Sequence, residues 1–198
     1  MKLLYTPNSP FARKVRVLLR ERKATAMVEE CVVSPFDDMD LVRQANPLAK
    51  IPVLLLPEAD PLFDSSVIVE YLDAVLPGST GIKEGEDRWQ TLRRQSLGNG
   101  VMDAAVAMTF ERTRTDTTPS PFWMERWDAA VRAGVAKLET GAAALGDLSD
   151  AGTISIACAL AYLDFRHPNM EWRIKAPTLK RWFEETSSRS SMQETAPG

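Results

Sequence analysis

The first third of the chain alternates between short apolar runs and longer segments whose apolar residues recur at helical spacing. The runs at residues 2–5, 27–33 and 50–56 predict strands, and residues 62–63 predict a brief fourth strand in a hairpin with the third. Helical spacing predicts helices over residues 10–23, 37–45 and 65–77, the second of which stops at Asn46-Pro47. The predicted order is therefore β-α-β-α-β-β-α.

The rest of the chain predicts helices only. Pro77-Gly78-Ser79-Thr80-Gly81 has the composition of a linker. Beyond it, helical stretches occupy about 84–114, 121–145, 153–166 and 177–187, with no convincing strand between them. The pattern predicts an α/β domain at residues 1–77, a linker at 78–84 and an all-helical domain at 85–198.

Composition and charge narrow the class of protein. Of the 198 residues, 44% are hydrophobic and 26% are charged, and the net charge of −3 gives no global attraction to nucleic acid. No apolar run reaches the roughly 18 residues that a membrane span needs, and the N-terminal run is too short for a signal peptide. Cys31 and Cys158 are far apart and lack metal-ligand spacing, so we expect reduced thiols, no metal and a cytoplasmic location.

Basic residues gather in and just after the first predicted helix, at positions 13, 14, 16, 20, 22 and 23. Such a cluster could indicate a face for a membrane or for nucleic acid. Aromatic residues are not interleaved with it, however, as they would be in a surface that binds single strands. We therefore expect a solvated helix face, with neither a membrane nor nucleic acid as a partner.

A serine stands where the first strand passes into the first helix. Ser9-Pro10 is a strong helix start, because serine accepts hydrogen bonds from the first turn and proline suits the first helical position. Ser9 is thus fully explained as a cap, yet its hydroxyl is also a candidate for chemistry.

Two later segments have the same double character. In NPLAKIPVLLL (46–56), a cis Pro52 would leave the backbone of Val53 free to pair with an extended, peptide-like ligand, although an ordinary start of a strand explains it equally well. In LFDSSVIVEYL (62–72), Asp64-Ser65 opens a helix whose first N–H groups could receive a carboxylate or simply be capped.

The order of these three segments resembles that of the soluble glutathione transferases, and in particular bacterial members of the serine type. The likeness extends over nearly the whole chain and includes GVMDAAV (100–106), ALAYLDFRHP (159–168) and the C-terminal APTLKRWFEETSSRSSMQETAP. It implies a thioredoxin-like N-terminal domain, an all-helical C-terminal domain, glutathione as co-substrate, a homodimer and a role in detoxification.

Carried over residue by residue, the resemblance implies a role for each segment. Ser9 matches the hydroxyl that hydrogen-bonds the glutathione sulfur. Pro52 matches the cis-proline of the family, and Val53 the backbone partner of the cysteinyl part. Asp64 and Ser65 match the pair that receives the γ-glutamyl end, with Asp64 in place of the commoner Glu or Gln. The start of the third strand supplies two weaker matches, Lys50 and Ile51. Lys50 could meet the glycyl carboxylate there.

The predicted activity is ionisation of glutathione and conjugation of its thiolate to a small electrophile. A free thiol is only a few per cent ionised at pH 7, and a hydrogen bond worth roughly 1.5–3 kcal/mol to the thiolate would lower the thiol pKa by about one to two units. If Ser9 is only a cap, Tyr5 or Asn8 is the next candidate to hold the sulfur. We expect the electrophile to contact Asn8, Phe11, Met102, Val106 and Phe110.

Two alternatives to conjugation stay open, because a fold does not fix a function. One is a glutathione-fold binding or interaction protein with little turnover. The other is a specialised glutathione-dependent isomerase or dehalogenase. The first strand-to-helix turn carries Ser9 where cysteine-type members carry their cysteine, which argues against a disulfide-reductase role.

Some remaining features predict structure rather than chemistry. His167 is expected at the surface or as a cap, and Cys31 as a buried, inert thiol. Asp150 should cap the helix that begins near Thr153, although a threonine there is a poorer reciprocal partner than a carboxylate. The tryptophans at 123, 127, 172 and 182 are expected to pack between helices.

Overall fold

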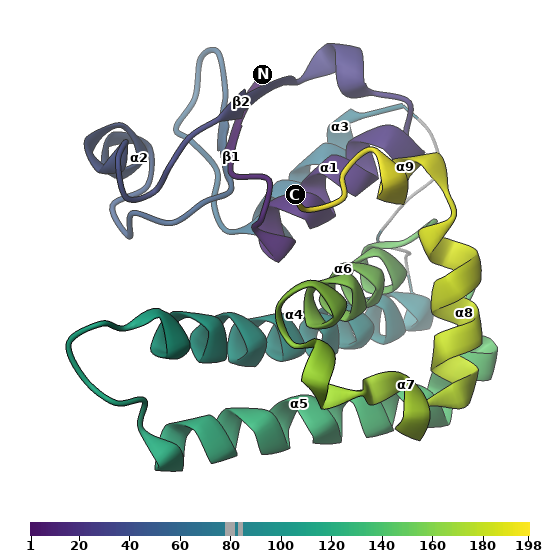
Figure 1. Ribbon diagram of the computed structural model, residues 1–198. Helices are drawn as coiled ribbons and strands as arrows, with labels where there is room; N and C mark the ends of the chain where they lie inside the picture. Colours follow the sequence, from purple (N-terminus) through teal and green to yellow (C-terminus); the bar gives the residue numbers. More distant parts are fainter. Residues whose placement is uncertain (78–81, 83–84) are drawn as a thin grey trace.

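The computed structural model describes residues 1–77, 82 and 85–198, and it stacks a small sheet with its helices on a layer of longer helices (Figure 1). The sheet layer contains β1 (Lys2–Tyr5), α1 (Pro10–Glu21), the 3-10 turn η1 (Thr25–Met27), β2 (Glu29–Val32), α2 (Met39–Ala45), β3 (Val53–Leu55) and α3 (Ser65–Val75). The remainder contains α4 (Glu86–Thr113), α5 (Pro121–Gly141), η2 (Ala142–Ala144), α6 (Ala151–Arg166), η3 (Pro168–Met170), α7 (Trp172–Lys175), α8 (Pro177–Ser187) and α9 (Ser190–Gln193).

The sheet has the strand order β2-β1-β3, with β2 parallel and β3 antiparallel to β1. The predicted fourth strand is reduced to a single antiparallel bridge between Leu54 and Leu62, closed by two hydrogen bonds of 2.9 and 3.0 Å. The pairing does not extend further along the chain. Before Leu62, Pro61 lacks an N–H, and after it, Asp64 already caps α3.

Strand β1 is buried on both faces because helices cover both sides of the sheet. Leu3 joins the main core with α1 and α3, whereas its neighbour Leu4 packs on the opposite face with Val42 of α2 and Val53. This alternation follows from the period of two along a strand. In Figure 1, α2 accordingly lies across β1 from α1 and α3.

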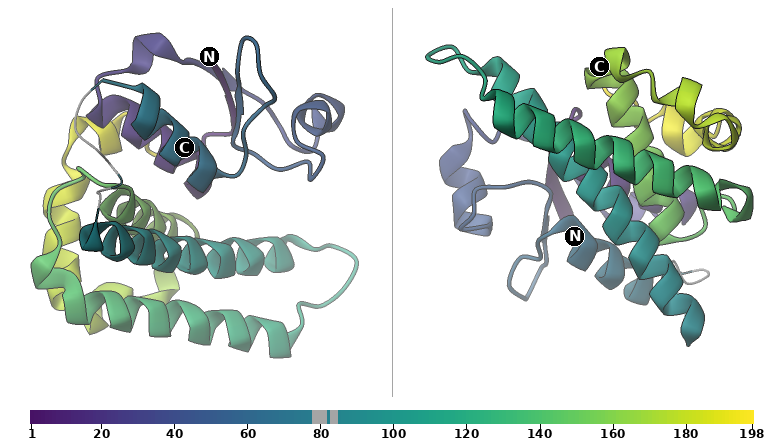
Figure 2. Two further views of the ribbon diagram at one scale, coloured as in Figure 1. Left: turned by 180° about the vertical axis from the view of Figure 1, so that it is seen from behind. Right: turned by 90° about the horizontal axis from the view of Figure 1, so that it is seen from below.

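Helix α6 is the centre of the molecule. It packs against α4 and α1, and α5 runs antiparallel to α4 and packs on it (Figures 1 and 2). Its residues are apolar nearly all round, which is the pattern of a buried helix. Gly98 permits the close crossing of α4 and α6, because a Cβ there would lie 2.8 Å from the carbonyl carbon of Ser155. Helix α4 runs through Gly98-Asn99-Gly100 without a break.

The start of α6 confirms the predicted cap. The Asp150 side chain accepts from the backbone N–H of Thr153 at 2.8 Å. Thr153 returns a bond of a different kind, because its hydroxyl donates to the backbone carbonyl of Asp150 at 3.0 Å.

The prediction of a solvated basic face on α1 is wrong. Arg13, Lys14 and Arg16 are between 0% and 7% exposed, because α1 lies between the sheet, α6 and the C-terminal segment with α9. The arginines find partners there: Arg13 donates to the carbonyl of Met192 at 2.8 Å, and Arg16 pairs with Glu30 at 2.8 Å. Of the cluster, Lys23 alone is classed as exposed.

Of the two alternatives for His167, the cap holds: His167 is 2% exposed, and its backbone N–H donates to the carbonyl of Leu163 at the end of α6. Two smaller expectations need correction. Cys31 is only half-buried, since β2 is an edge strand. Trp123 is 47% exposed, whereas Trp172 and Trp182 pack in the core as predicted.

The predicted linker, residues 78–84, lies outside the described residues except for Ile82, so the three domain boundaries stay predictions. Within the described part of the chain, no helix combines the length and the apolar character needed to cross a membrane.

Candidate functional site

Ser9 is the N-cap of α1. Its side-chain oxygen accepts from the backbone N–H of Ala12 at 3.2 Å, and its own N–H donates to the carbonyl of Thr6 at 3.1 Å. The structural role of Ser9 is therefore confirmed. A hydroxyl has one hydrogen as well as two lone pairs, so a serine that accepts the cap bond can still donate its hydrogen to another atom.

The sheet topology brings the three predicted segments to one edge. Strand β1 runs toward Ser9, and the antiparallel β3 begins at Val53, opposite Leu4. Because Leu62 pairs with Leu54, the chain then runs back beside β3 and reaches the start of α3 at this same edge. The peptide bond before Pro52 is cis, as the resemblance implies.

The start of α3 is built around Asp64. Its exposed carboxylate accepts from the N–H of Ser66 at 2.8 Å, while Ser65 is 2% exposed at the first helical position. Unpaired N–H groups and the helix dipole make the first turn of a helix favourable for an anion. An amino-acid end that carries both charges could meet the N–H groups with its carboxylate and Asp64 with its ammonium.

The weaker predicted contacts lie at the rim of this edge. Lys50 is exposed, and its carbonyl accepts from the side chain of Asn46 at 2.8 Å. Ile51 is half-buried and packs against both hydrophobic clusters. The pKa of Asp103 on α4 is raised, mainly by burial. The charge of Lys50 opposes this shift, and the charge of Asp64 adds to it. Asp103 therefore faces the same edge, a position that the sequence reasoning missed.

The five residues predicted to contact an electrophile divide into separate groups. Met102 is fully buried in the core, so it offers no surface to a ligand. Phe11 and Val106 are partly buried against that core. Asn8 is half-buried, and its side-chain oxygen has no hydrogen-bond partner among the described residues. Phe110 is 54% exposed.

Phe110 contacts a residue that sequence reasoning did not select. The ring of Phe36, in the loop before α2, meets it edge to face with 6.2 Å between the ring centroids. Phe36 is itself 69% exposed. The two aromatic rings join the sheet layer to α4, and only the packing of these layers brings them together.

Lys14 is a third important residue whose role sequence reasoning missed. Its Nζ donates to Ser66 Oγ at 3.3 Å and to Asn99 Oδ1 at 3.1 Å. Asn99 also donates to Ser66 Oγ at 2.9 Å. Burial lowers the pKa of Lys14 to about 8, and the charges of Asp64 and Asp103 oppose that shift. An ammonium is therefore held directly behind the first turn of α3.

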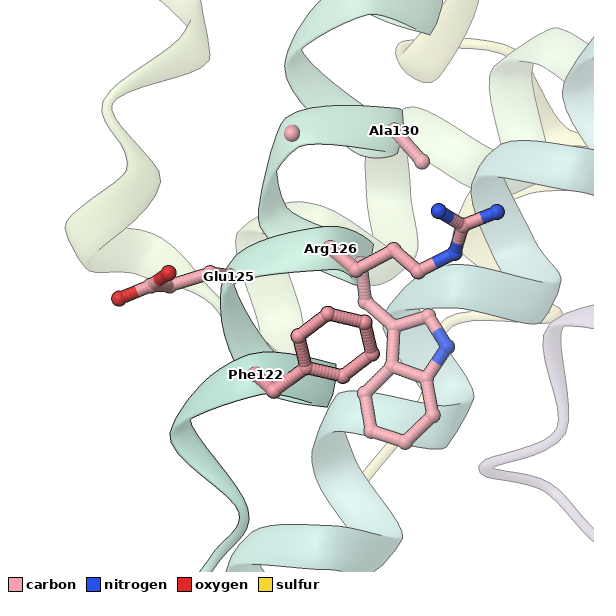
Figure 3. A pocket seen from close by; sticks show the side chains of 6 residues that line it. Phe122, Glu125, Arg126 and Ala130 are labelled. Carbon is pink, nitrogen blue, oxygen red and sulfur yellow. The ribbon is translucent and has the colours of Figure 1, made fainter.

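The surface has two hollows that differ in how they are built. A small one beside Ser9 is lined by Pro7, Asn8, Ser9, Pro10, Arg13, Cys158, Tyr162 and Pro197. Burial raises the pKa of Cys158 to about 11, so this thiol is neutral and unreactive at pH 7. A wider, shallow hollow lies on α5, where Glu125 points away from the ring of Phe122 (Figure 3). It is formed by one helix face alone, and we place the candidate chemistry at Ser9.

Comparison with known proteins identifies the family of the chain. The family model described as the N-terminal domain of glutathione S-transferase matches residues 8–75, and that of the C-terminal domain matches residues 121–185. The chain belongs to the soluble glutathione transferase superfamily, and its fold class is confirmed as a thioredoxin-like domain followed by a helical one.

Individual relatives cover the chain from end to end. The uncharacterized GST-like protein YibF of Escherichia coli is 31% identical over all of this chain and 98% of its own length. A glutathione transferase family member of Pseudomonas fluorescens Pf-5, solved with bound S-(propanoic acid)-glutathione, is 38% identical with a TM-score of 0.90, and all of both chains is covered. A glutathione S-transferase of Methylobacillus flagellatus with glutathione bound is 34% identical, with a TM-score of 0.92 over 100% of this chain and 99% of the other.

Proposed function

We propose that this protein binds glutathione, ionises its thiol beside Ser9 and conjugates the thiolate to a small electrophile. The observation that carries the proposal is the Ser9 hydroxyl, whose oxygen accepts the cap bond from Ala12 and whose hydrogen can still be donated. The start of β3 at Val53 and the first turn of α3, which lie at the same edge, support it, as do the glutathione-bound structures of relatives.

The role of Ser9 is electrostatic. A hydrogen bond to an anion contributes roughly 1.5–3 kcal/mol, which lowers a thiol pKa by about one to two units when it acts only on the thiolate. The positive end of the α1 dipole acts in the same direction. The thiolate then attacks an electrophilic carbon, so that a carbon–sulfur bond forms and the displaced electron pair leaves with the leaving group or moves onto an adjoining acceptor.

The other contacts follow the same edge. The backbone of Val53 would pair with the cysteinyl part, and the first turn of α3, with Asp64 and Ser65, would hold the γ-glutamyl end. Lys50, next to Ile51, is exposed where it could meet the glycyl carboxylate. Of the electrophile contacts, Asn8, Phe11, Val106 and Phe110 stay in the proposal, and Phe36 joins them. The homodimer, the cytoplasmic location and the role in detoxification stay predictions from the resemblance.

The test separates capping from ionisation. The thiolate absorbance of bound glutathione is titrated in the wild type and in Ser9→Ala, and we expect the variant to raise the thiol pKa by about one to two units. Loss of the cap should cost roughly 0.5–2 kcal/mol of stability. Asp150→Ala is the matched control, because it removes the cap of α6 and should lower stability without moving the thiol pKa.

Turnover with a panel of model electrophiles completes the test. A thiol pKa that is the same in wild type and Ser9→Ala would contradict the proposed role of Ser9. Binding and ionisation of glutathione with no turnover on any electrophile would favour the alternative of a binding protein.

A further inference from the structure

The ammonium of Lys14 is buried, and the needs of folding do not explain why a charge is placed there. Its side chain is 0% exposed, and within residues 1–77, 82 and 85–198 no carboxylate lies within 4 Å of its Nζ. Taking a charge out of water is costly unless it is paired, whereas a methionine or leucine would fill similar space without that cost. The position of this charge therefore indicates a function.

The two hydrogen bonds of Lys14 lead to the anion-accepting end of α3. Ser66, which accepts one of them, is the second residue of α3, and its N–H closes the Asp64 cap. Asn99, which accepts the other, donates in turn to the same Ser66 hydroxyl. The ammonium, the helix dipole and the free N–H groups of the first turn thus all favour a negative charge at one point.

We propose that Lys14 is a positioning residue of the glutathione site, which stabilises the γ-glutamyl carboxylate through Ser66 and takes up a proton when that carboxylate binds. This inference rests on the proposed function. Lys14 lies behind the first turn and acts through it, without a place in the reaction at sulfur.

The proton uptake follows from the charges that face Lys14. They are the carboxylates of Asp64, the N-cap of α3, and of Asp103 on α4, with Arg13 beside Lys14 on α1. Cys158 of α6 also faces Lys14, but its thiol is neutral at pH 8. Because its pKa is lowered to about 8 in the free protein, Lys14 is about half protonated at pH 8. A further negative charge within about 4–6 Å raises the pKa of a cation by about one unit or more. A shift from about 8 to about 9 takes up about 0.4 proton at pH 8.

The experiment is calorimetry of S-methylglutathione binding at pH 8, in two buffers that differ in ionisation enthalpy. The methylated sulfur carries no proton, so it cannot contribute to the uptake. We expect the wild type to take up about 0.4 proton per bound ligand more than Lys14→Arg, whose guanidinium stays charged in both states. The ligand amino group titrates alike in both proteins, so their difference isolates Lys14.

Affinity at pH 7 gives a second readout. Lys14→Met should bind about tenfold more weakly, since one pKa unit of coupling corresponds to a factor of ten. Lys14→Arg should retain most of the affinity. Lys23→Met, at the exposed lysine that follows α1, should match the wild type in both affinity and proton uptake.

The outcomes separate this inference from the proposed function. Equal proton uptake in the wild type and Lys14→Arg would overturn the role of Lys14 while glutathione binding stood. Lys14→Met binding as tightly as the wild type at pH 7 would do the same. If S-methylglutathione bound to no variant, wild type included, the proposed function would fail and this inference with it.

Discussion

Replacing Gly98 by alanine should destabilise the protein, although alanine is the better helix former. In a helix interior, Gly→Ala ordinarily stabilises by about 0.5–1 kcal/mol. A Cβ at Gly98, however, would lie 2.8–2.9 Å from the carbonyl carbon, Cβ and carbonyl oxygen of Ser155. Carbon atoms prefer about 3.5–4.0 Å, so α4 and α6 would have to separate by several tenths of an ångström or more.

The net effect is a difference of two terms. Overpacking of this kind costs typically 1–3 kcal/mol, because backbone atoms cannot rotate out of the way. After the gain in helix propensity is subtracted, Gly98→Ala should lower the free energy of unfolding by roughly 1–2 kcal/mol. Gly100, two residues along the same helix, meets nothing within 4 Å of the added Cβ. Gly100→Ala should therefore raise stability by about 0.5–1 kcal/mol.

Urea denaturation followed by circular dichroism measures both variants against the wild type. The denaturation midpoints should move in opposite directions with the slope of the transition unchanged. In a thermal scan, a chain of this size shifts by about 2–4 °C per kcal/mol. If Gly98→Ala is as stable as the wild type, or if both variants shift in the same direction, the added Cβ does not strain the crossing of α4 and α6.

The remaining predictions concern pH. His167 is the only histidine of the chain; burial and then the charge of Arg112 lower its pKa below the ordinary 6.5. NMR titration should show this low pKa, and stability should fall as pH drops below about 6.5, because the unfolded chain then binds a proton that the folded ring resists; a ring pKa of 6.5 or above would contradict it. Burial by itself would raise the pKa of Glu30, but hydrogen bonds from Arg20 and Arg16 outweigh it and lower the pKa. Glu30→Gln should therefore cost roughly 1–3 kcal/mol at pH 7, and that difference should shrink as pH falls below the ordinary pKa of 4.5, because the unfolded carboxylate then binds a proton that the folded one resists. Urea midpoints at pH 7 and pH 3.5 test it, and an equal loss at both would be evidence against the ion pairs.

The sequence by itself determined the features that depend on neighbours in the chain. Strand β1 has the predicted bounds of residues 2–5, and α8 those of 177–187, because alternation, helical spacing and a starting proline are local signals. The caps at Ser9, Asp64 and Asp150 are confirmed for the same reason, since each bonds an N–H only two or three residues ahead. Two of those caps, at Ser9 and Asp64, together with the Lys-Ile-Pro-Val segment at 50–53 between them, also supplied the resemblance to the family.

Only the tertiary structure decided which side chains are buried and what meets them. The pattern of basic residues on α1 predicted a solvated face. The partners of Lys14 lie 52 and 85 positions along the chain, so no local pattern indicates them. Met102 was predicted to contact the electrophile, but it is fully buried in the core where α4 packs against α6. The contact of Phe36 with Phe110 likewise exists only because two layers pack together. Burial is a property of the packed chain, so a charge or a ring acquires its environment only when distant segments close around it.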